Sequence, residues 1–527
     1  WSNGSCITGT HNVAIGTNAM AANTASYNTA VGGLALDSNS SGANNVAIGY
    51  AALHSNTSAP GQVAVGAEAL ALNQSGGENT AVGYQSLMTQ VSDGHMNTAV
   101  GYKAGRLNLS GQSITAIGFK ALEANTTGDG NTAVGQQALV VNTTGHSNVG
   151  VGQSALLANI TGADNTAVGY GTLAANLTGG NTAVGKQSQR VTTTGASNTS
   201  MGKHSMYANT TGANNVAIGN DALSSNTTAT ANTAVGTLTL VANTTGTNNT
   251  ALGYEALRNE TTGEGNVALG SGCLYAVTTG YSNIAIGYNT LRGTTVYQNV
   301  IIGHDAGGSA TTMNRNVMVG HKAGLYSTTG DHNVFLGHHA GANGTNNTTG
   351  SNSIYIGAYA HGNTGGANLI NVLGYNVEGA NETFTFGASA TDSRIAHGAT
   401  SISAPSDQRL KEEITTSTAG LSFVNDLRPV TFKWKKEKDI PTGMNGYVEG
   451  SEKRFKTATT EHGFIAQEVK TVMDSHSEIK DGFDMWSEDS TGGRQRLADG
   501  ALIPILVKAI QELSTKNDAL VARITAL

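Results

Sequence analysis

The segment Asn215-Val-Ala-Ile-Gly219 is one copy of a short motif that recurs along most of the chain. Other copies are Asn45-Val-Ala-Ile-Gly49 and Asn131-Thr-Ala-Val-Gly135. A Leu usually follows four residues after the Gly, as at Leu139, and a turn-forming Asn-Thr-Thr-Gly comes next, as at Asn142. The Gly of the motif recurs at 21 positions: 16, 32, 49, 66, 83, 101, 118, 135, 152, 169, 185, 202, 219, 236, 253, 270, 287, 303, 320, 337 and 357. The spacing is about 17 residues, and such self-similarity is typical of repeat architectures.

A unit of this length is too short for a helical hairpin, but it accommodates two strands of about five residues with a tight turn after each. We therefore expect each unit to form one coil of a β-roll or β-helical shaft over residues 1–357. Strand alternation places Val or Ile on one face and Ala on the other. We expect the Val or Ile and the Leu of each coil to be the residues available for burial.

Two apolar side chains a coil make a thin core for a lone chain, so we expect other copies to cover the remaining stripe. The repeat resembles the β-roll heads of YadA-like trimeric adhesins, which carry a similar Asn-x-Val-Ala-Ile-Gly motif but usually somewhat shorter repeats. The resemblance covers most of residues 10–360. It implies a homotrimeric shaft.

Composition excludes several other classes of protein. The 527 residues include 70 Gly, 5 Pro and 2 Cys, which fits neither collagen nor a disulfide-stabilised scaffold. No segment approaches the roughly 18 to 20 apolar residues of a membrane helix, so we expect no membrane insertion. Residues 1–400 hold 11 basic and 16 acidic residues, and residues 401–527 hold 17 and 19, so neither part has the basic excess of a nucleic-acid binder.

Three histidines in the repeats, His304, His321 and His338, are spaced by 17 residues and should stack on one another. The same slot holds Tyr in other units, such as Tyr254 and Tyr288, so His alone lacks ligand specificity there. We expect no metal site and no cofactor. The many Asn-x-Thr triplets match a glycosylation sequon, but turn chemistry explains them better because they recur where each coil must bend.

The period fails near residue 358. We expect residues 358–405 to form a non-repetitive β tip, which is either a recognition surface or an inert end of the shaft. From Ser401 onward the composition is that of a small α+β domain, with a helix near 420–427, a strand at 430–434 and a final helix at 502–527.

Four elements of this C-terminal part occur in a fixed order: Ser406-Asp-Gln-Arg-Leu-Lys411, then Leu427-Arg-Pro-Val430 with Phe432 and Trp434, then Gly463-Phe-Ile-Ala-Gln-Glu-Val469, then Leu502-Ile-Pro-Ile-Leu-Val-Lys-Ala-Ile-Gln-Glu-Leu513. Together they resemble the intramolecular chaperone domain of phage tail spikes and fibres, the peptidase S74 family. The resemblance covers residues 406–527. It implies that this domain guides the assembly of three chains and then cuts itself away.

The resemblance also implies a Ser/Lys dyad, with Ser406 as nucleophile, Lys411 as base and Pro405-Ser406 as the scissile bond. A serine hydroxyl needs a base, and Lys can serve once desolvation lowers its pKa. Self-cleavage is the only enzymatic activity that we expect.

The final helix carries a heptad pattern with alternating spacings of four and three residues: Leu506, Ile510, Leu513, Asn517, Leu520, Ile524 and Leu527. This set is called the seam below. Ile at position a with one Asn normally favours a parallel dimer, whereas the family resemblance implies three chains. We expect the trimer, because about three heptads must conform to the shaft.

The leading hypothesis is a structural virion protein, a trimeric tail fibre or spike that binds a host cell-surface receptor, glycan or protein. It would assemble in the host cytoplasm and reside in the virion. The first residue is Trp1, so we expect a missing N-terminal region that contacts other tail proteins. Two alternatives stay open, a bacterial trimeric surface adhesin and a glycan-degrading tailspike.

Overall fold

The computed structural model describes residues 8–91, 93–342, 348–364, 366, 368–389, 391–398, 408, 411–442, 444, 446–479, 485–488 and 495–526. The chain divides into two compact units, Trp1–Pro405 and Ser406–Leu527, and each is described by itself. No helix in these ranges is long and apolar enough to cross a bilayer.

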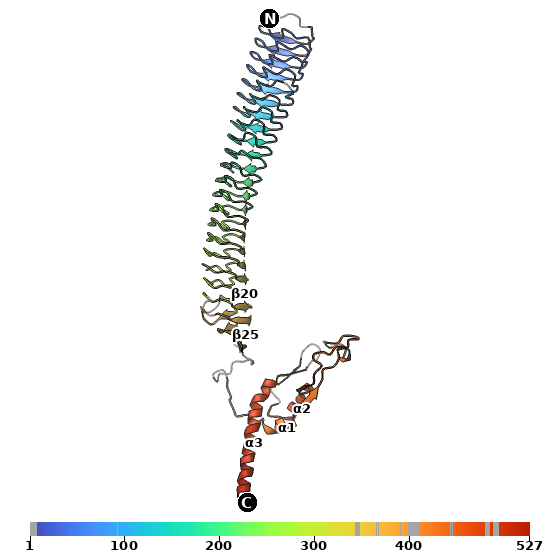
Figure 1. The fold of residues 1–527 in the computed structure, drawn as a ribbon, viewed down its shortest axis with the longest axis vertical. Helices are drawn as coiled ribbons and strands as arrows, with labels where there is room; N and C mark the ends of the chain where they lie inside the picture. Colours follow the sequence, from blue (N-terminus) through green and yellow to red (C-terminus); the bar gives the residue numbers. More distant parts are fainter. Residues whose placement is uncertain are drawn as a thin grey trace. The chain divides into compact units, whose positions relative to one another are not determined.

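The first unit is a β-solenoid, a stack of coils that Figure 1 shows from blue to brown. Each repeat contributes one strand of three residues, and consecutive strands pair in parallel. The strands are β1 (Val13–Ile15), β2 (Thr29–Val31), β3 (Val46–Ile48), β4 (Val63–Val65), β5 (Thr80–Val82), β6 (Thr98–Val100), β7 (Thr115–Ile117), β8 (Thr132–Val134), β9 (Val149–Val151), β10 (Thr166–Val168), β11 (Thr182–Val184), β12 (Thr199–Met201), β13 (Val216–Ile218), β14 (Thr233–Val235), β15 (Thr250–Leu252), β16 (Val267–Leu269), β17 (Ile284–Ile286), β18 (Val300–Ile302), β19 (Val317–Val319), β20 (Val334–Leu336) and β21 (Ile354–Ile356).

The second half of each coil is not the five-residue strand that we expected. In the coil after β8, Gln137 has φ 56° and Leu139 has φ 50°, and this left-handed backbone is incompatible with a strand. The coils remain hydrogen-bonded here, because the Leu139 N–H donates to the Ala155 carbonyl at 2.9 Å. Main-chain bonding between coils therefore continues beyond the strands.

The face of each strand that points into the core is the opposite of the one that we expected. In most coils the central Ala of the strand faces inward with the Leu of the turn, and Ala133 and Leu139, for example, are fully buried. The third residue faces outward, and Ile48 and Ile117 are about two-fifths exposed (40% and 38%). The expectation that Val or Ile fills the core was wrong, and these residues form an apolar stripe on the outside.

Buried asparagines run through the stack as two hydrogen-bonded ladders. In the first, the Asn142 side-chain amide donates to Asn125 Oδ1 at 3.0 Å and to the Gly145 carbonyl at 2.9 Å, and Asn159 repeats the pattern on Asn142. In the second, the backbone N–H of Asn148 donates to Asn131 Oδ1 at 3.0 Å. Asn125 and Asn142 belong to sequons and are fully buried, as the turn interpretation requires.

Towards β21 the residue at the strand position of the core becomes larger, and the residue at the turn position becomes smaller. The strand position, Ala in most coils, becomes Ile301, Met318, Phe335 and then Tyr355, and the rings of Phe335 and Tyr355 stack with centroids 4.8 Å apart. The turn position, Leu in most coils, is Gly307, Gly324 and Gly341 in the coils of Ile301, Met318 and Phe335, and a Cβ at Gly341 would lie 2.8 Å from Phe335 Cδ2. The large and small residues have exchanged places, which keeps the packed volume nearly constant.

Stacking continues past residue 357, although the sequence motif fails there. Strand β23 (Asn371–Tyr375) pairs in parallel with β21, with Ile354 opposite Asn371, and β25 (Thr383–Ala388) pairs in parallel with β23. The short strands β22 (His361–Gly362) and β24 (Glu378–Gly379) pair beside them. The antiparallel β26 (Thr391–Ala396) then covers the edge of β25, so the parallel stack ends in a hairpin.

The second unit is a small α+β assembly, as expected. Its elements are α1 (Leu421–Asp426), β27 (Val430–Phe432), the 3₁₀ turn η2 (Glu437–Asp439), β28 (Glu461–Gly463), α2 (Ala466–Ser475), β29 (Trp486–Glu488), β30 (Gln495–Leu497), η3 (Asp499–Ala501) and α3 (Leu502–Thr525). Strands β27 and β28 pair antiparallel, as do β29 and β30.

One acid interrupts the first asparagine ladder. Glu260 is fully buried in the slot that Asn243 holds one coil earlier, and one of its carboxyl oxygens accepts the N–H of Gly263. Its other oxygen and Asn243 Oδ1 have no hydrogen-bond partner among the described residues. Burial raises the pKa of Glu260 to about 7, and a neutral carboxyl group supplies the proton donor that the ladder lacks at this step.

We expect Glu260→Gln to stabilise the shaft at alkaline pH. The folded pKa of about 7 lies above the ordinary 4.5. The stability that the neutral Glu260 contributes is therefore complete below pH 4.5 and is lost as pH rises through 7, a loss of roughly 3 kcal/mol. Gln90 already occupies this slot in an earlier coil, where its amide donates to the Gly94 carbonyl at 2.7 Å. Urea unfolding at pH 5 and pH 8 measures the difference.

The matched control is Glu264→Gln, which changes an exposed acid four residues away. It should leave the pH dependence intact. An unfolding midpoint of Glu260→Gln that follows the wild type at both pH values would contradict the assignment of a buried, neutral Glu260.

Candidate functional site

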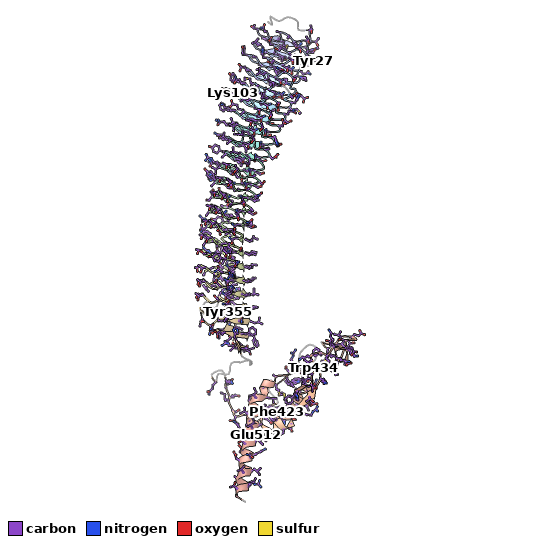
Figure 2. All side chains as sticks on the ribbon, viewed as in Figure 1. Tyr27, Lys103, Tyr355, Phe423, Trp434 and Glu512 are labelled. Atoms are coloured by element: carbon purple, nitrogen blue, oxygen red, sulfur yellow. The ribbon has the colours of Figure 1, made fainter. Side chains whose placement is uncertain are left out.

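The second unit is held together by three helices around one small core. Phe423 of α1, Val469 and Met473 of α2 and Ile505 of α3 are buried in it. Figure 2 labels Phe423 on the small helix that packs beside α3. This core fixes the face of α3 that carries Leu502, Ile505 and Ala509.

A carboxylate on α3 caps α1. Glu512 Oε2 accepts the N–H of Leu421, the first residue of α1, at 2.9 Å, and Lys508 Nζ lies 3.5 Å from Glu512 Oε1. The Leu421 N–H and, more weakly, Lys508 hold the pKa of Glu512 below its ordinary value. A Cβ at Gly420 would lie 2.8 Å from the carboxylate, so a larger residue there would require the Glu512 side chain to shift.

His476 joins the ends of α1 and α2. Its Nδ1 lies 2.9 Å from Glu478 Oε1, its Nε2 lies 2.8 Å from Asp426 Oδ2, and its ring packs edge-on against Phe423. The hydrogen bonds to Glu478 and then Asp426 raise the pKa of His476. His476 and Glu512 did not emerge from the sequence, because their partners lie 50 and 91 residues away along the chain.

The seam lies on a different face of α3 from the core residues. Its apolar members are exposed, with Ile510 at 66% and Leu513 at 56%, and Asn517 is exposed among them. The other described members are Leu506, Leu520 and Ile524, all exposed, whereas Leu527 lies outside the described residues. The single chain thus presents an uncovered apolar row on a regular helix.

The residues of the expected dyad fall at the start of this unit. Lys411 is exposed, and its backbone N–H donates to the Gln408 carbonyl at 3.1 Å. Pro405 and Ser406 lie outside the described residues, so the pairing of Ser406 with Lys411 stays a prediction. The division between the two compact units falls at these same two residues.

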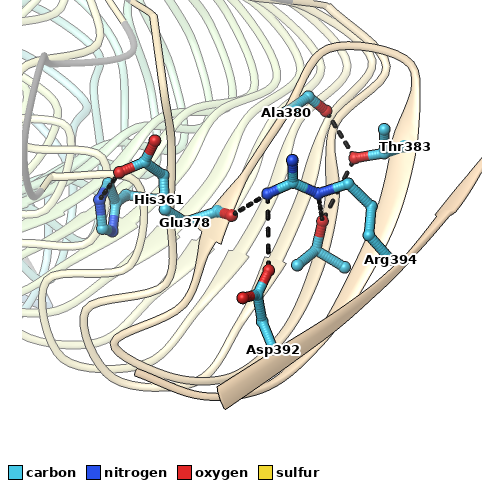
Figure 3. A network of polar contacts seen from close by, with 7 residues as sticks. His361, Glu378, Ala380, Thr383, Asp392 and Arg394 are labelled. Carbon is cyan, nitrogen blue, oxygen red and sulfur yellow. Dashed lines mark hydrogen bonds and ion pairs between the residues drawn. The ribbon is translucent and has the colours of Figure 1, made fainter. Parts of the chain in front are cut away.

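The end of the shaft carries a polar network (Figure 3). The Arg394 guanidinium donates to Thr385 Oγ1 at 3.2 Å and to the Glu378 carbonyl at 3.1 Å, and it lies 3.5 Å from Asp392. These bonds tie β26 to β25 and to β24. The network therefore fastens the terminal hairpin, as a solenoid cap requires.

Comparison with known families finds a match within the second unit. Residues 406–477 match the model of the Peptidase_S74 family, described as the chaperone of endosialidase. This range includes α1, β27, β28 and α2 and ends before α3. The chain thus joins such a chaperone domain to a β-solenoid of stacked coils, a combination consistent with a phage tail fibre or tailspike. A comparison with curated proteins finds no match.

Proposed function

We propose that this chain is a structural virion protein, a trimeric phage tail fibre or spike that attaches to the host cell surface. The C-terminal unit drives trimerisation and then cuts the chain before Ser406, with Ser406 as nucleophile and Lys411 as base. The shaft remains in the virion and binds a surface receptor.

The observation that carries this proposal is the exposed apolar row on α3, beside a domain of the chaperone family. A heptad row of Leu and Ile is stable in water only when partner helices cover it. Three copies of α3 would bury Ile510 and Leu513 at a common axis.

The surface of the shaft also supports association with other copies of the chain. The outward stripe continues over many coils, for example at Ile48, Met201 and Leu252, each two-fifths to one-half exposed. A stripe of this length on a lone solenoid would be an aggregation hazard. Neighbouring shafts in a trimer would cover it.

A chaperone at one end also answers a problem of register. Neighbouring coils are nearly identical, so shifting one shaft against another by one repeat would preserve most contacts. The C-terminal unit does not repeat the motif of the coils, so its copies lack this choice of nearly equivalent registers. It can therefore fix the register before the shafts join.

The test is Ile510→Asp with Leu513→Asp, made in a Ser406→Ala chain so that the C-terminal unit stays attached. Charges at the seam should prevent assembly, so sedimentation velocity should show single chains or aggregates instead of trimers. The control Thr515→Asp places a charge on the opposite side of the helix and should leave the trimer intact. Control trimers should compete with the virus for adsorption to host cells, whereas the double variant should not compete. Trimer formation by the double variant would contradict the proposal.

A further inference from the structure

Four aromatic side chains form a row on the surface of the shaft near its C-terminal end. The rings of Tyr288, His304, His321 and His338 stack in consecutive coils, with centroids 5.2, 5.3 and 5.0 Å apart. The sequence predicted the histidine stack. It did not predict that His339, from the neighbouring slot, lies against it.

His339 turns the row into a cluster. Its ring centroid lies 4.5 Å from that of His338 and 5.6 Å from that of His321, one coil away. One ring nitrogen from each of the three histidines lies within 4.8 Å of the others. Among the described residues, this is the one group of three His, Cys, Asp or Glu side chains that could hold a metal ion.

We propose that His321, His338 and His339 bind a divalent transition-metal ion, Zn²⁺ in the first instance. In a tetrahedral zinc site with bonds of 2.0–2.1 Å, neighbouring nitrogens are about 3.3 Å apart. Each nitrogen must therefore move inward by about 1 Å, which rotation about the broad χ2 torsion of His supplies. Such an ion links two coils and keeps one position open for water or an outside ligand.

The surroundings fit neutral imidazole ligands. Desolvation, and then repulsion from Lys322 and the neighbouring histidines, lowers the pKa of both His321 and His339. Lys322 acts on both rings and opposes a bound cation. The ring of Tyr359 lies against the rings of His338 and His339 and limits their rotation on one side.

This inference goes beyond fibre assembly and does not depend on it. The sequence argument against a metal rested on a slot that accepts Tyr as readily as His. That argument holds for a single row, but a pair of adjacent histidines beside a third in the next coil provides three imidazoles, a set that zinc sites use.

The test is calorimetric titration of the full chain with Zn²⁺, after purification without a histidine tag and dialysis against a chelator. We expect one saturable site per chain. The variants His338→Tyr and His339→Lys should each weaken binding by more than about tenfold. They place in these slots the residues that other coils carry there, Tyr288 and Lys322, so the shaft should fold normally, as circular dichroism would verify.

Two controls separate this site from scattered histidines. His332→Gln removes an exposed histidine outside the cluster and should leave binding unchanged, and Lys322→Gln should tighten it by removing the opposing charge. Co²⁺ should give the intense visible absorption of a four-coordinate ion in the wild type and lose it in His339→Lys. Absence of saturable binding up to about 1 mM Zn²⁺, or wild-type affinity in His339→Lys, would overturn the proposal.

Discussion

Ser406→Ala should abolish cleavage completely and leave one polypeptide where the wild type gives two. Without the hydroxyl no acyl intermediate can form, so the loss is all or none instead of graded. Denaturing electrophoresis counts the products. N-terminal sequencing of the smaller wild-type product should begin at Ser406.

Lys411→Arg tests the role of the base separately. Arg keeps the positive charge but does not lose its proton in proteins, so it cannot activate a serine. We expect no cleavage, with trimer formation retained. The control Ser403→Ala removes a nearby serine outside the motif and should cut normally; cutting in Ser406→Ala, or a new N-terminus at another residue, would refute the dyad.

The second large effect is expected from Gly118→Ala in the middle of the shaft. Gly118 has φ 134°, and a Cβ there would lie 2.6 Å from the carbonyl oxygen of Gly135 in the next coil. Both the backbone conformation and the clash exclude alanine, because the neighbour is main chain and cannot move aside. We expect a loss of more than about 4 kcal/mol per chain, seen as insoluble protein or a large fall in melting temperature.

Gly33→Ala is the chemically identical control. A Cβ at Gly33 would meet only ordinary contacts, the nearest being Tyr50 Cδ2 at 3.8 Å, and this slot carries larger residues in other coils. Its melting temperature should stay close to that of the wild type. Equal tolerance of both substitutions would mean that the motif glycine is not required by the backbone of the coil.

The period of the sequence was enough to predict a stack of coils, but not which face points inward. In Val216-Ala-Ile218 all three residues are apolar, so alternation defines two faces without telling which is the core. In the structure Ala217 is buried in the same core as Leu223 of the turn, while Ile218 lies on the outside. The left-handed conformation of such leucines could not be predicted, because non-glycine residues rarely adopt it.

The C-terminal unit was predictable where its signals are local. The heptad pattern predicted α3, which spans Leu502–Thr525, and the apolar residues near 421 predicted α1. The cap of α1 by Glu512 and the contact of His476 with Asp426 are long-range contacts that leave no local pattern. The cluster at His338 was predictable only in part. The sequence shows two adjacent histidines one repeat after a third, but whether all three rings come together depends on the shape of the coil.

Sedimentation equilibrium of the uncut Ser406→Ala chain tests the trimeric fibre most directly. The apolar stripe of the shaft and the seam both need cover from other copies, so we expect a mass of three times 53.6 kDa. A stable, soluble species of 53.6 kDa with a folded shaft would contradict it.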